Sequence, residues 1–450
     1  MLATIAPVTA LLIGASILLL GNGVQSLLLP IRASDEAFST MVIGLMGAAY
    51  PAGFILSCLS TPQLVQRVGH IRTFAVLAAI AGVSALAHAV LVVPLAWVVL
   101  RLISGFCFAG LFMVIESWLN EAASNTTRGQ IFSTYMVVNL ASVTAGQLLI
   151  GLGDPGDFRL FALAASAIIL SLVPVGLTTS KGPPPIEVVQ LRLGRLYRMS
   201  PVGVLGCFFV GVANGSFGSL GPIFAGAAGL SVGEIALFMS AGLIGGAVFQ
   251  MPIGRLSDRM DRRRVIVAAS LVAVLLGVTM MLVGDARAGG RLLAFDAGAI
   301  ELPQGALIAL AFFFGAAIHP IYGLCTAHTN DFVERAEFVE ASSGLLLTWG
   351  LGAATGPLLA SVLMEIAGPG SLFLFTAAAH LACALFALWR ISRRTAPRPD
   401  ERDVFVPANA AARTTPVATV LDPRSELMPE ADSISPATAS GEPARQPGPS

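Results

Sequence analysis

The densest charge in this sequence is the segment GRLSDRMDRRR, residues 254–264, in a chain of which only 12% of residues are charged. Asp258 can accept hydrogen bonds from the free amides at the N-terminus of a facing helix, while Arg259 and Arg262 can pair with acids across a helix bundle. One exposed pair contributes only about 0.5 kcal/mol, but several together can bias an equilibrium between two helix arrangements. The segment, which starts at Gly254, therefore predicts an electrostatic gate. The alternative interpretation is a solvated turn whose arginines only orient the chain.

A second set of candidates consists of single polar residues inside long apolar runs. Arg101 is the most informative, because an arginine at the centre of a membrane helix costs roughly 2.5 to 3.5 kcal/mol and tends to be kept for function. His319 titrates near neutral pH and can carry a proton, and Tyr322 follows it closely. The alternatives are snorkelling of Arg101 towards the membrane surface and a packing role for His319.

Five side-chain amides also interrupt apolar runs, at Asn22, Gln25, Asn139, Gln147 and Asn214. Neutral amides favour hydrogen bonds to hydroxyl or amide groups of a ligand over recognition of an ion. Polar packing between helices is the alternative for each of them.

Composition indicates what surrounds these residues. The 450 residues are 55% hydrophobic with a net charge of +0, and the mean hydropathy is +0.81, which does not describe a surface in water. Continuous apolar runs recur with about the 20 residues that a helix needs to cross roughly 30 Å of hydrocarbon, which favours helices over a β-barrel. We expect twelve spans, at residues 7–30, 39–65, 73–93, 95–118, 130–151, 158–178, 201–225, 231–254, 265–284, 304–326, 341–364 and 371–391.

The distribution of arginine and lysine predicts the orientation. With a cytoplasmic N-terminus, sixteen of these residues fall on the internal side and only four on the external side, namely Arg32, Arg159, Arg287 and Arg291. This skew predicts that both termini lie in the cytoplasm. We therefore expect a multi-pass protein of a bacterial cytoplasmic (inner) membrane, with the arginine segment inside.

The chain repeats itself at an offset of 192 residues over its first spans and of 210 residues from the fourth span on. The matched pairs include Asn22 with Asn214, Pro30 with Pro222, Ser39 with Ser231, Gly53 with Gly245, Gly105 with Gly315, Asn120 with Asn330 and Glu121 with Asp331. Arg259 in turn corresponds to Arg67. By this repeat, Glu116, Glu121 and Asp331 are the acids expected to face the arginine segment.

The repeat predicts an all-α membrane protein with two pseudo-symmetric six-helix halves, at residues 1–178 and 201–391. A basic cytoplasmic linker, 179–200, joins them. Residues 392–450 are rich in proline and small polar residues, which predicts a disordered cytoplasmic tail. Repeats of this kind place a substrate site near the bilayer midplane, where the halves meet.

Several motifs carry a resemblance to a known family. GRLSDRMDRRR resembles the Gly-x-Leu-x-Asp-Arg-x-Gly-Arg-Arg loop of the major facilitator superfamily, with Asp261 in place of the second glycine. RLISGFCFA (101–109) is similar to the Arg-x-x-x-Gly motif in the fourth helix of many proton-coupled members. ESWLNEAASNTTRGQIFS (116–133) resembles the bacterial YcaD-like subgroup. The resemblance implies a twelve-helix fold, alternating access and proton coupling.

Together these observations favour a secondary transporter that moves a small organic solute, with the direction left open. A transporter-like sensor that binds a ligand without net flux is the alternative. The chain has no Gly-x-x-x-x-Gly-Lys-Ser/Thr loop for ATP, and its five cysteines lack metal-ligand spacing. We expect no enzyme activity, cofactor, metal site or nucleic-acid partner, and a monomer that works in the lipid bilayer.

Overall fold

Membrane-length helices make up the computed structural model, which describes residues 8–124, 126–177, 183, 192–287, 304–334, 337–393, 404–406 and 414–421. The first six spans are α2 (Thr9–Asp35), α3 (Thr40–Val68), α4 (His70–Val90), α5 (Pro94–Glu121), α6 (Arg128–Leu149), and α7 with α8 (Phe158–Leu170 and Leu172–Gly176). The second six are α10 (Pro201–Ala227), α11 (Val232–Arg259), α12 (Arg262–Arg287), α13 (Gln304–Asn330), α14 (Phe338–Ala367) and α15 (Ser371–Arg393). The prediction of twelve spans is confirmed for the described residues.

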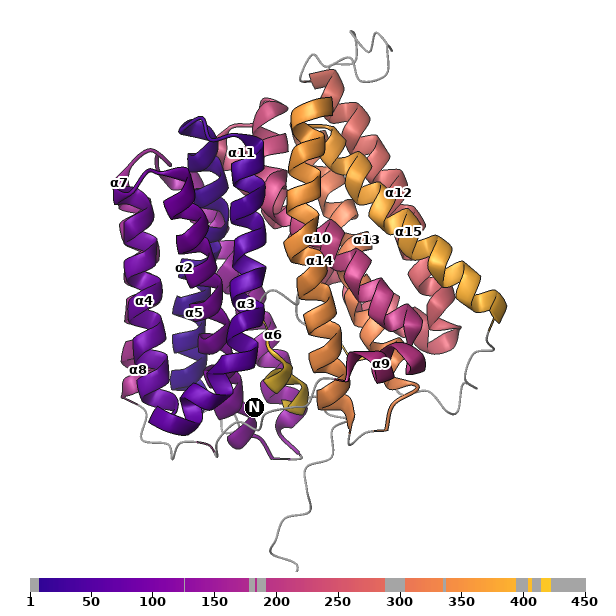
Figure 1. Cartoon of the computed structure of the whole chain (residues 1–450), viewed down its shortest axis with the longest axis horizontal. Helices are drawn as coiled ribbons and strands as arrows, with labels where there is room; N and C mark the ends of the chain where they lie inside the picture. The colour runs from indigo at the N-terminus through magenta and orange to yellow at the C-terminus, as the bar shows by residue number, and fades with distance from the viewer. Residues whose placement is uncertain are drawn as a thin grey trace, which may run out of the picture.

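The two halves lie side by side, with the first half at the left of Figure 1 and the second at the right. In the first half α3 packs against α5 and α2 against α6, and in the second half α11 packs against α13 and α10 against α14. The same contacts are thus made twice by the helices that repeat in sequence. The halves meet where α14 packs along α3 and where α11 packs against α6.

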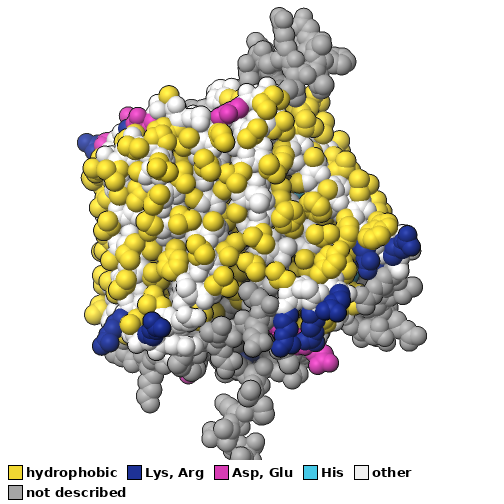
Figure 2. Space-filling view, in the orientation of Figure 1, with side chains coloured by type: hydrophobic (Ala, Val, Ile, Leu, Met, Phe, Trp, Pro, Cys, Tyr) yellow, Lys and Arg dark blue, Asp and Glu magenta, His cyan; other side chains and the backbone are white. Residues whose placement is uncertain are grey.

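The outer surface of the bundle is apolar. Large side chains such as Val83, Val248 and Leu275 are 64%, 54% and 67% exposed. Figure 2 shows such side chains across the middle of one face, with arginine mainly along its lower edge. An exposed apolar surface this extensive fits lipid rather than water.

Repeated serines begin two equivalent helices. The Ser39 hydroxyl accepts the amide of Val42 at the start of α3, and the Ser231 hydroxyl accepts the amide of Glu234 at the start of α11. The Glu234 carboxylate in return accepts the backbone N–H of Ser231 at 2.8 Å. The second pair forms a capping box, so the repeat in sequence is also a repeat of helix starts.

Repeated glycines allow the paired helices to touch backbone to backbone. A Cβ atom added at Gly53 or Gly105 would collide with the backbone of the partner helix across the α3–α5 contact. A Cβ atom added at Gly245 or Gly315 would likewise collide with the partner backbone across the α11–α13 contact. In a membrane, where the hydrophobic effect does not drive helices together, such close approach supplies much of the packing energy.

The two ends of the bundle differ in charge and in how the halves meet. We call the end where α3, α5, α11 and α13 finish the arginine-rich face, and the other end the opposite face. The arginine-rich face carries Arg67, Arg72, Arg128, Arg192, Arg195, Arg198, Arg255, Arg259, Arg262, Arg263, Arg264, Arg390 and Arg393. At the opposite face the halves touch directly: the Met41 N–H donates to Glu365 Oε1 at 2.9 Å, and Gly44 packs against Ser361.

Parts of the predicted linker and tail are also helical. Within the linker, α9 covers Leu193–Met199, while 179–182 and 184–191 lie outside the described residues. Within the predicted disordered tail, 404–406 and a 3-10 helix, η6 (Pro416–Leu421), pack against the bundle, because Phe405 and Thr415 supply buried side chains. Residues 394–403, 407–413 and 422–450 lie outside the described residues.

The backbone contact between α11 and α13 gives a first prediction. Gly315→Ala adds one methyl group where α11 leaves no room, and overpacking of this kind costs about 1–3 kcal/mol. We expect the thermal unfolding midpoint of the detergent-purified protein to fall by several degrees. Gly305→Ala, on the same helix, is the matched control, because a Cβ there meets nothing within 4 Å. Equal midpoints for the two variants would contradict this account of the packing.

Candidate functional site

A cavity of about 220 Å³ lies between the two halves. Its walls come from α2, α3, α5 and α6 of the first half and from α10, α11, α13 and α14 of the second. The lining is mainly apolar, with polar side chains at Asn22, Ser26, Tyr50, Arg101, Gln147, Asn214, Ser219, His319 and Tyr322. A mostly apolar cavity with a few polar groups is the usual form of a small-molecule site.

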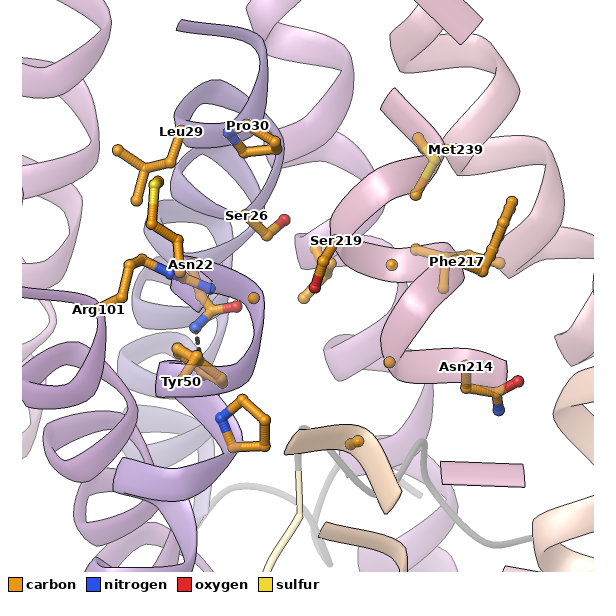
Figure 3. A pocket seen from close by; sticks show the side chains of 18 of the residues that line it. Asn22, Ser26, Leu29, Pro30, Tyr50, Arg101, Asn214, Phe217, Ser219 and Met239 are labelled. Atoms are coloured by element: carbon orange, nitrogen blue, oxygen red, sulfur yellow. Dashed lines mark hydrogen bonds between the residues drawn. The ribbon is translucent and has the colours of Figure 1, made fainter. Parts of the chain in front are cut away.

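One wall carries a cation held by an aromatic ring. The guanidinium carbon of Arg101 lies 4.5 Å from the centroid of the Tyr50 ring, and the Tyr50 hydroxyl accepts a hydrogen bond from Asn22 Nδ2 at 3.1 Å. Figure 3 shows these three side chains together, with Asn214 and Ser219 across the cavity from them. A cation–π contact orients a guanidinium but does not neutralise its charge.

The cavity has a positive formal charge. No aspartate or glutamate lines it, and in the described part of the chain Arg101 forms no ion pair with a carboxylate. At the repeat offset of 210 residues, the second half has Ala311 where the first has Arg101. The amides alone had favoured hydrogen bonding over recognition of an ion. The structure places the positive charge of Arg101 in the same cavity as the amides of Asn22 and Asn214.

Six of the eight cavity candidates line the cavity, namely Asn22, Arg101, Gln147, Asn214, His319 and Tyr322. Gln25 does not, since its amide is buried away from the cavity without a hydrogen-bond partner among the described residues. Asn139 does not line the cavity either, and its side chain bonds to Tyr135 on the same helix. Apolar sequence around an amide does not reveal which side of the helix faces the cavity.

Other lining residues were not singled out from the sequence. Tyr50 holds Arg101, and Trp349 of α14 lines the cavity and packs against Tyr322 with ring centroids 6.4 Å apart. Aromatic residues within an apolar helix give no signal that separates a cavity wall from a packed core. Tyr50 could have been identified only by knowing how α3 packs against α5, which carries Arg101.

Arg262 is the centre of the charge network at the arginine-rich face. Its Nε donates to Asp331 Oδ2 at 2.8 Å, and its Nη1 donates to Asp258 Oδ1 and to the Ser257 hydroxyl, both at 3.0 Å. Arg262 is 1% exposed. The predicted pairing of Arg262 with Asp331 is present, but it joins α11, α12 and α13 of one half. It therefore links three helices of that half and does not cross between the halves.

The observed partner of Asp258 differs from the predicted one. Besides Arg262, its Oδ1 accepts the backbone N–H of Phe405 at 2.9 Å. The expected donors were amides of a facing helix N-terminus, whereas this amide belongs to the non-helical segment 404–406. The ring of Phe405 packs on Gly254, where a Cβ would collide with it. Both Gly254 and Asp258 therefore hold the C-terminal segment.

Asp261, which stands where the loop motif has its second glycine, binds the neighbouring Arg263. Its carboxylate accepts the backbone N–H of Arg263 at 3.0 Å and the side-chain Nε and Nη2 of the same residue at 3.0 and 2.8 Å. Burial alone would raise the pKa of Asp261, but these hydrogen bonds and the charge of Arg263 outweigh it and lower the pKa. Asp261 thus stays ionised and holds Arg263 at the start of α12.

Glu116, expected to meet an arginine, has hydroxyl and amide donors instead. It is fully buried, and its carboxylate accepts the hydroxyl of Tyr135 at 3.2 Å, the hydroxyl of Thr414 at 3.0 Å and the backbone N–H of Thr415 at 3.0 Å. The Thr415 hydroxyl donates to it as well. Nearby, Asn120 Nδ2 donates to the carbonyl oxygen of Val417 at 2.7 Å.

The remaining gate candidates are dispersed. Arg67, Arg259 and Glu121 are exposed at helix ends, and none of them forms an ion pair with another described residue. The predicted pairing of Arg259 with acids across the bundle is therefore absent from this state. Asn330 is buried, and its amide has no hydrogen-bond partner among the residues described.

Comparison with solved structures supports the fold. The nucleoside transporter NupG superimposes with a TM-score of 0.70 at 13% identity, covering 86% of this chain and 100% of that one. A bacterial homolog of the human lysosomal transporter Spinster, in an inward-facing and occupied conformation, gives 0.66 at 15% identity, covering 88% and 97%. At these identities the similarity concerns the fold alone.

Sequence comparison identifies the family. An uncharacterized MFS-type transporter of Enterobacter sp. (strain 638) is 26% identical over 393 residues, which cover 87% of this chain and 97% of the relative. The uncharacterized MFS-type transporter YcaD of Escherichia fergusonii is 25% identical over 397 residues, covering 86% and 97%. The family model of the Major Facilitator Superfamily matches residues 11–295 and 203–424. This chain therefore belongs to the major facilitator superfamily and is a membrane transporter of that family.

Proposed function

We propose that this protein is a secondary transporter for a small organic anion, which binds in the cavity between the two halves. The observation that carries the proposal is the guanidinium of Arg101, which lines the cavity without a carboxylate partner among the described residues. An arginine stays charged under all physiological conditions. A carboxylate or phosphate on the solute would supply the missing negative charge through charge-assisted hydrogen bonds.

The other lining residues fit the same solute class. Asn22 and Asn214 offer amide donors from the two halves, and Phe217, Met239 and Trp349 offer an apolar wall. A cavity of about 220 Å³ is smaller than the roughly 300 to 1,000 Å³ of sites for drug-sized ligands. The proposed solute is therefore a small molecule with one acidic end and an apolar part.

Transport in this proposal uses alternating access. The halves touch at the opposite face through Met41 and Glu365, so access to the opposite side would require them to separate there and approach each other at the arginine-rich face. In this proposal the arginine-rich face and both termini lie in the cytoplasm, which the excess of arginine on that face supports. The proposed location is the cytoplasmic membrane of a bacterium.

Proton coupling is part of the proposal. Among the described residues that line the cavity, His319 is the one whose side chain ordinarily titrates near neutral pH. A proton carried on His319 beside the anion would let both cross together. Acid on the side from which the solute enters would then accelerate uptake.

Arg101→Gln tests the solute class. We expect wild-type protein to be stabilised against heat more by small aromatic and aliphatic carboxylates than by their uncharged amides, for example by benzoate more than by benzamide. The apparent Kd values should differ by about tenfold or more, because a charge-assisted hydrogen bond contributes roughly 1.5–3 kcal/mol. Arg101→Gln should abolish this preference, while Arg101→Lys, which keeps the charge, should retain part of it.

Two outcomes would separate the parts of this proposal. Amides that stabilise as well as acids, or an Arg101→Gln variant with an unchanged preference, would exclude the anion. Binding of the acids without uptake into proteoliposomes would instead favour a transporter-like sensor. Flux measurements on the best acid of the panel therefore follow the binding measurements.

His319→Gln tests the coupling. In proteoliposomes, an imposed pH gradient, acid outside, should accelerate wild-type uptake of the best acid several-fold. His319→Gln should lose this response because glutamine cannot carry the proton. His380→Gln is the matched control, because His380 is buried on α15 away from the cavity, and it should keep the response. A full response in His319→Gln would contradict the proposed role.

A further inference from the structure

The C-terminal segment bridges the two halves at the arginine-rich face. We call residues 404–406 and 414–421 the C-terminal strap. Its 3-10 helix η6 packs against α5 and α6 of the first half and against α14 of the second. Figure 1 shows it as the short yellow helix between α6 and α14 at the lower edge of the molecule. The strap thus lies on the side away from the direct contacts of the opposite face.

The first anchor of the strap is a socket around Glu116. Among the described residues four donors reach this buried carboxylate, and three of them belong to the strap: the hydroxyl of Thr414 and the amide and hydroxyl of Thr415. Thr415 is 2% exposed. A buried carboxylate without such donors is strongly destabilising. Glu116 and the strap therefore depend on each other.

The second anchor is a socket for Phe405 in the other half. The ring lies on Gly254, where a Cβ would collide with it, and 3.3 Å from the position of a Cβ added at Gly323. Phe405 is 5% exposed, and its amide donates to Asp258 at 2.9 Å. Glycine at both positions leaves the space that the ring fills. The strap is thus attached to both halves through buried contacts.

We propose that the C-terminal strap is an autoinhibitory plug, which holds the transporter closed at the opposite face and blocks the cavity from the arginine-rich face. The halves can approach each other at the arginine-rich face only after η6 leaves the space between α5, α6 and α14. Its departure removes three donors from Glu116. Undocking is therefore a required and unfavourable step of the cycle, and removal of the strap increases access to the cavity.

Thiol labelling of the cavity tests the plug without knowledge of the solute. Gly218 lines the cavity, and a Cβ there meets nothing within 4 Å, so Gly218→Cys places a thiol in open space. In lipid nanodiscs a polar maleimide reaches both faces of the protein. We expect the Gly218→Cys chain that ends at residue 403 to label at least about ten times faster than the full-length chain. The protein without Gly218→Cys, measured in parallel, gives the background from the native cysteines.

Two controls keep the result specific to the strap. A chain that ends at residue 421 keeps the whole strap and lacks only residues 422–450, so it should label at the full-length rate. Thr415→Val removes one donor to Glu116 and should accelerate labelling, whereas Thr415→Ser keeps the hydroxyl and should not. Equal rates for the chain ending at 403 and the full-length chain would overturn the proposal. If the shortened chain does not accumulate, equal rates for Thr415→Val and Thr415→Ser would overturn it.

Discussion

A positive charge inside an apolar helix bundle is the constraint on which this structure depends. Hydrocarbon offers no solvation to a guanidinium, so Arg101 is stable only where a cavity, an aromatic ring and side-chain amides surround it. The Tyr50 ring, whose hydroxyl accepts a hydrogen bond from the Asn22 amide, orients the side chain without neutralising it. The charge that remains is available to a ligand, and the proposed selectivity for anions follows from it. The cavity is shared by two halves, and in the proposed cycle the same site opens to either face in turn.

The charges of the arginine-rich face act within one half. Arg262 links the adjacent ends of α11, α12 and α13 through Asp258 and Asp331. The halves are joined by other means: close packing, hydrogen bonds between Met41 and Glu365 and between Ser240 and Gln147, and the C-terminal strap at the arginine-rich face. In the proposed cycle the strap decides when the arginine-rich face can close.

Much of the fold could be predicted from sequence, because hydropathy and internal repeats are local or periodic signals. The spans, the two halves and the repeated pair of Asn22 and Asn214 can all be read from residue types and their spacing. The partners of Asp258 cannot, because one is a backbone amide 147 residues away in the chain, and a backbone amide leaves no trace in the residue types. Gln25 shows the second limit: a polar residue in an apolar helix can face packed neighbours instead of the cavity.

The most direct test of the central claim compares metabolites inside and outside cells by untargeted mass spectrometry. The cells express wild type or Arg101→Gln at matched membrane levels, in several media. The account predicts that the solutes whose distribution differs between the two are small organic acids, lost from wild-type cells if the protein exports and gained if it imports. Differences confined to neutral or cationic solutes, or no reproducible difference in any medium, would contradict it.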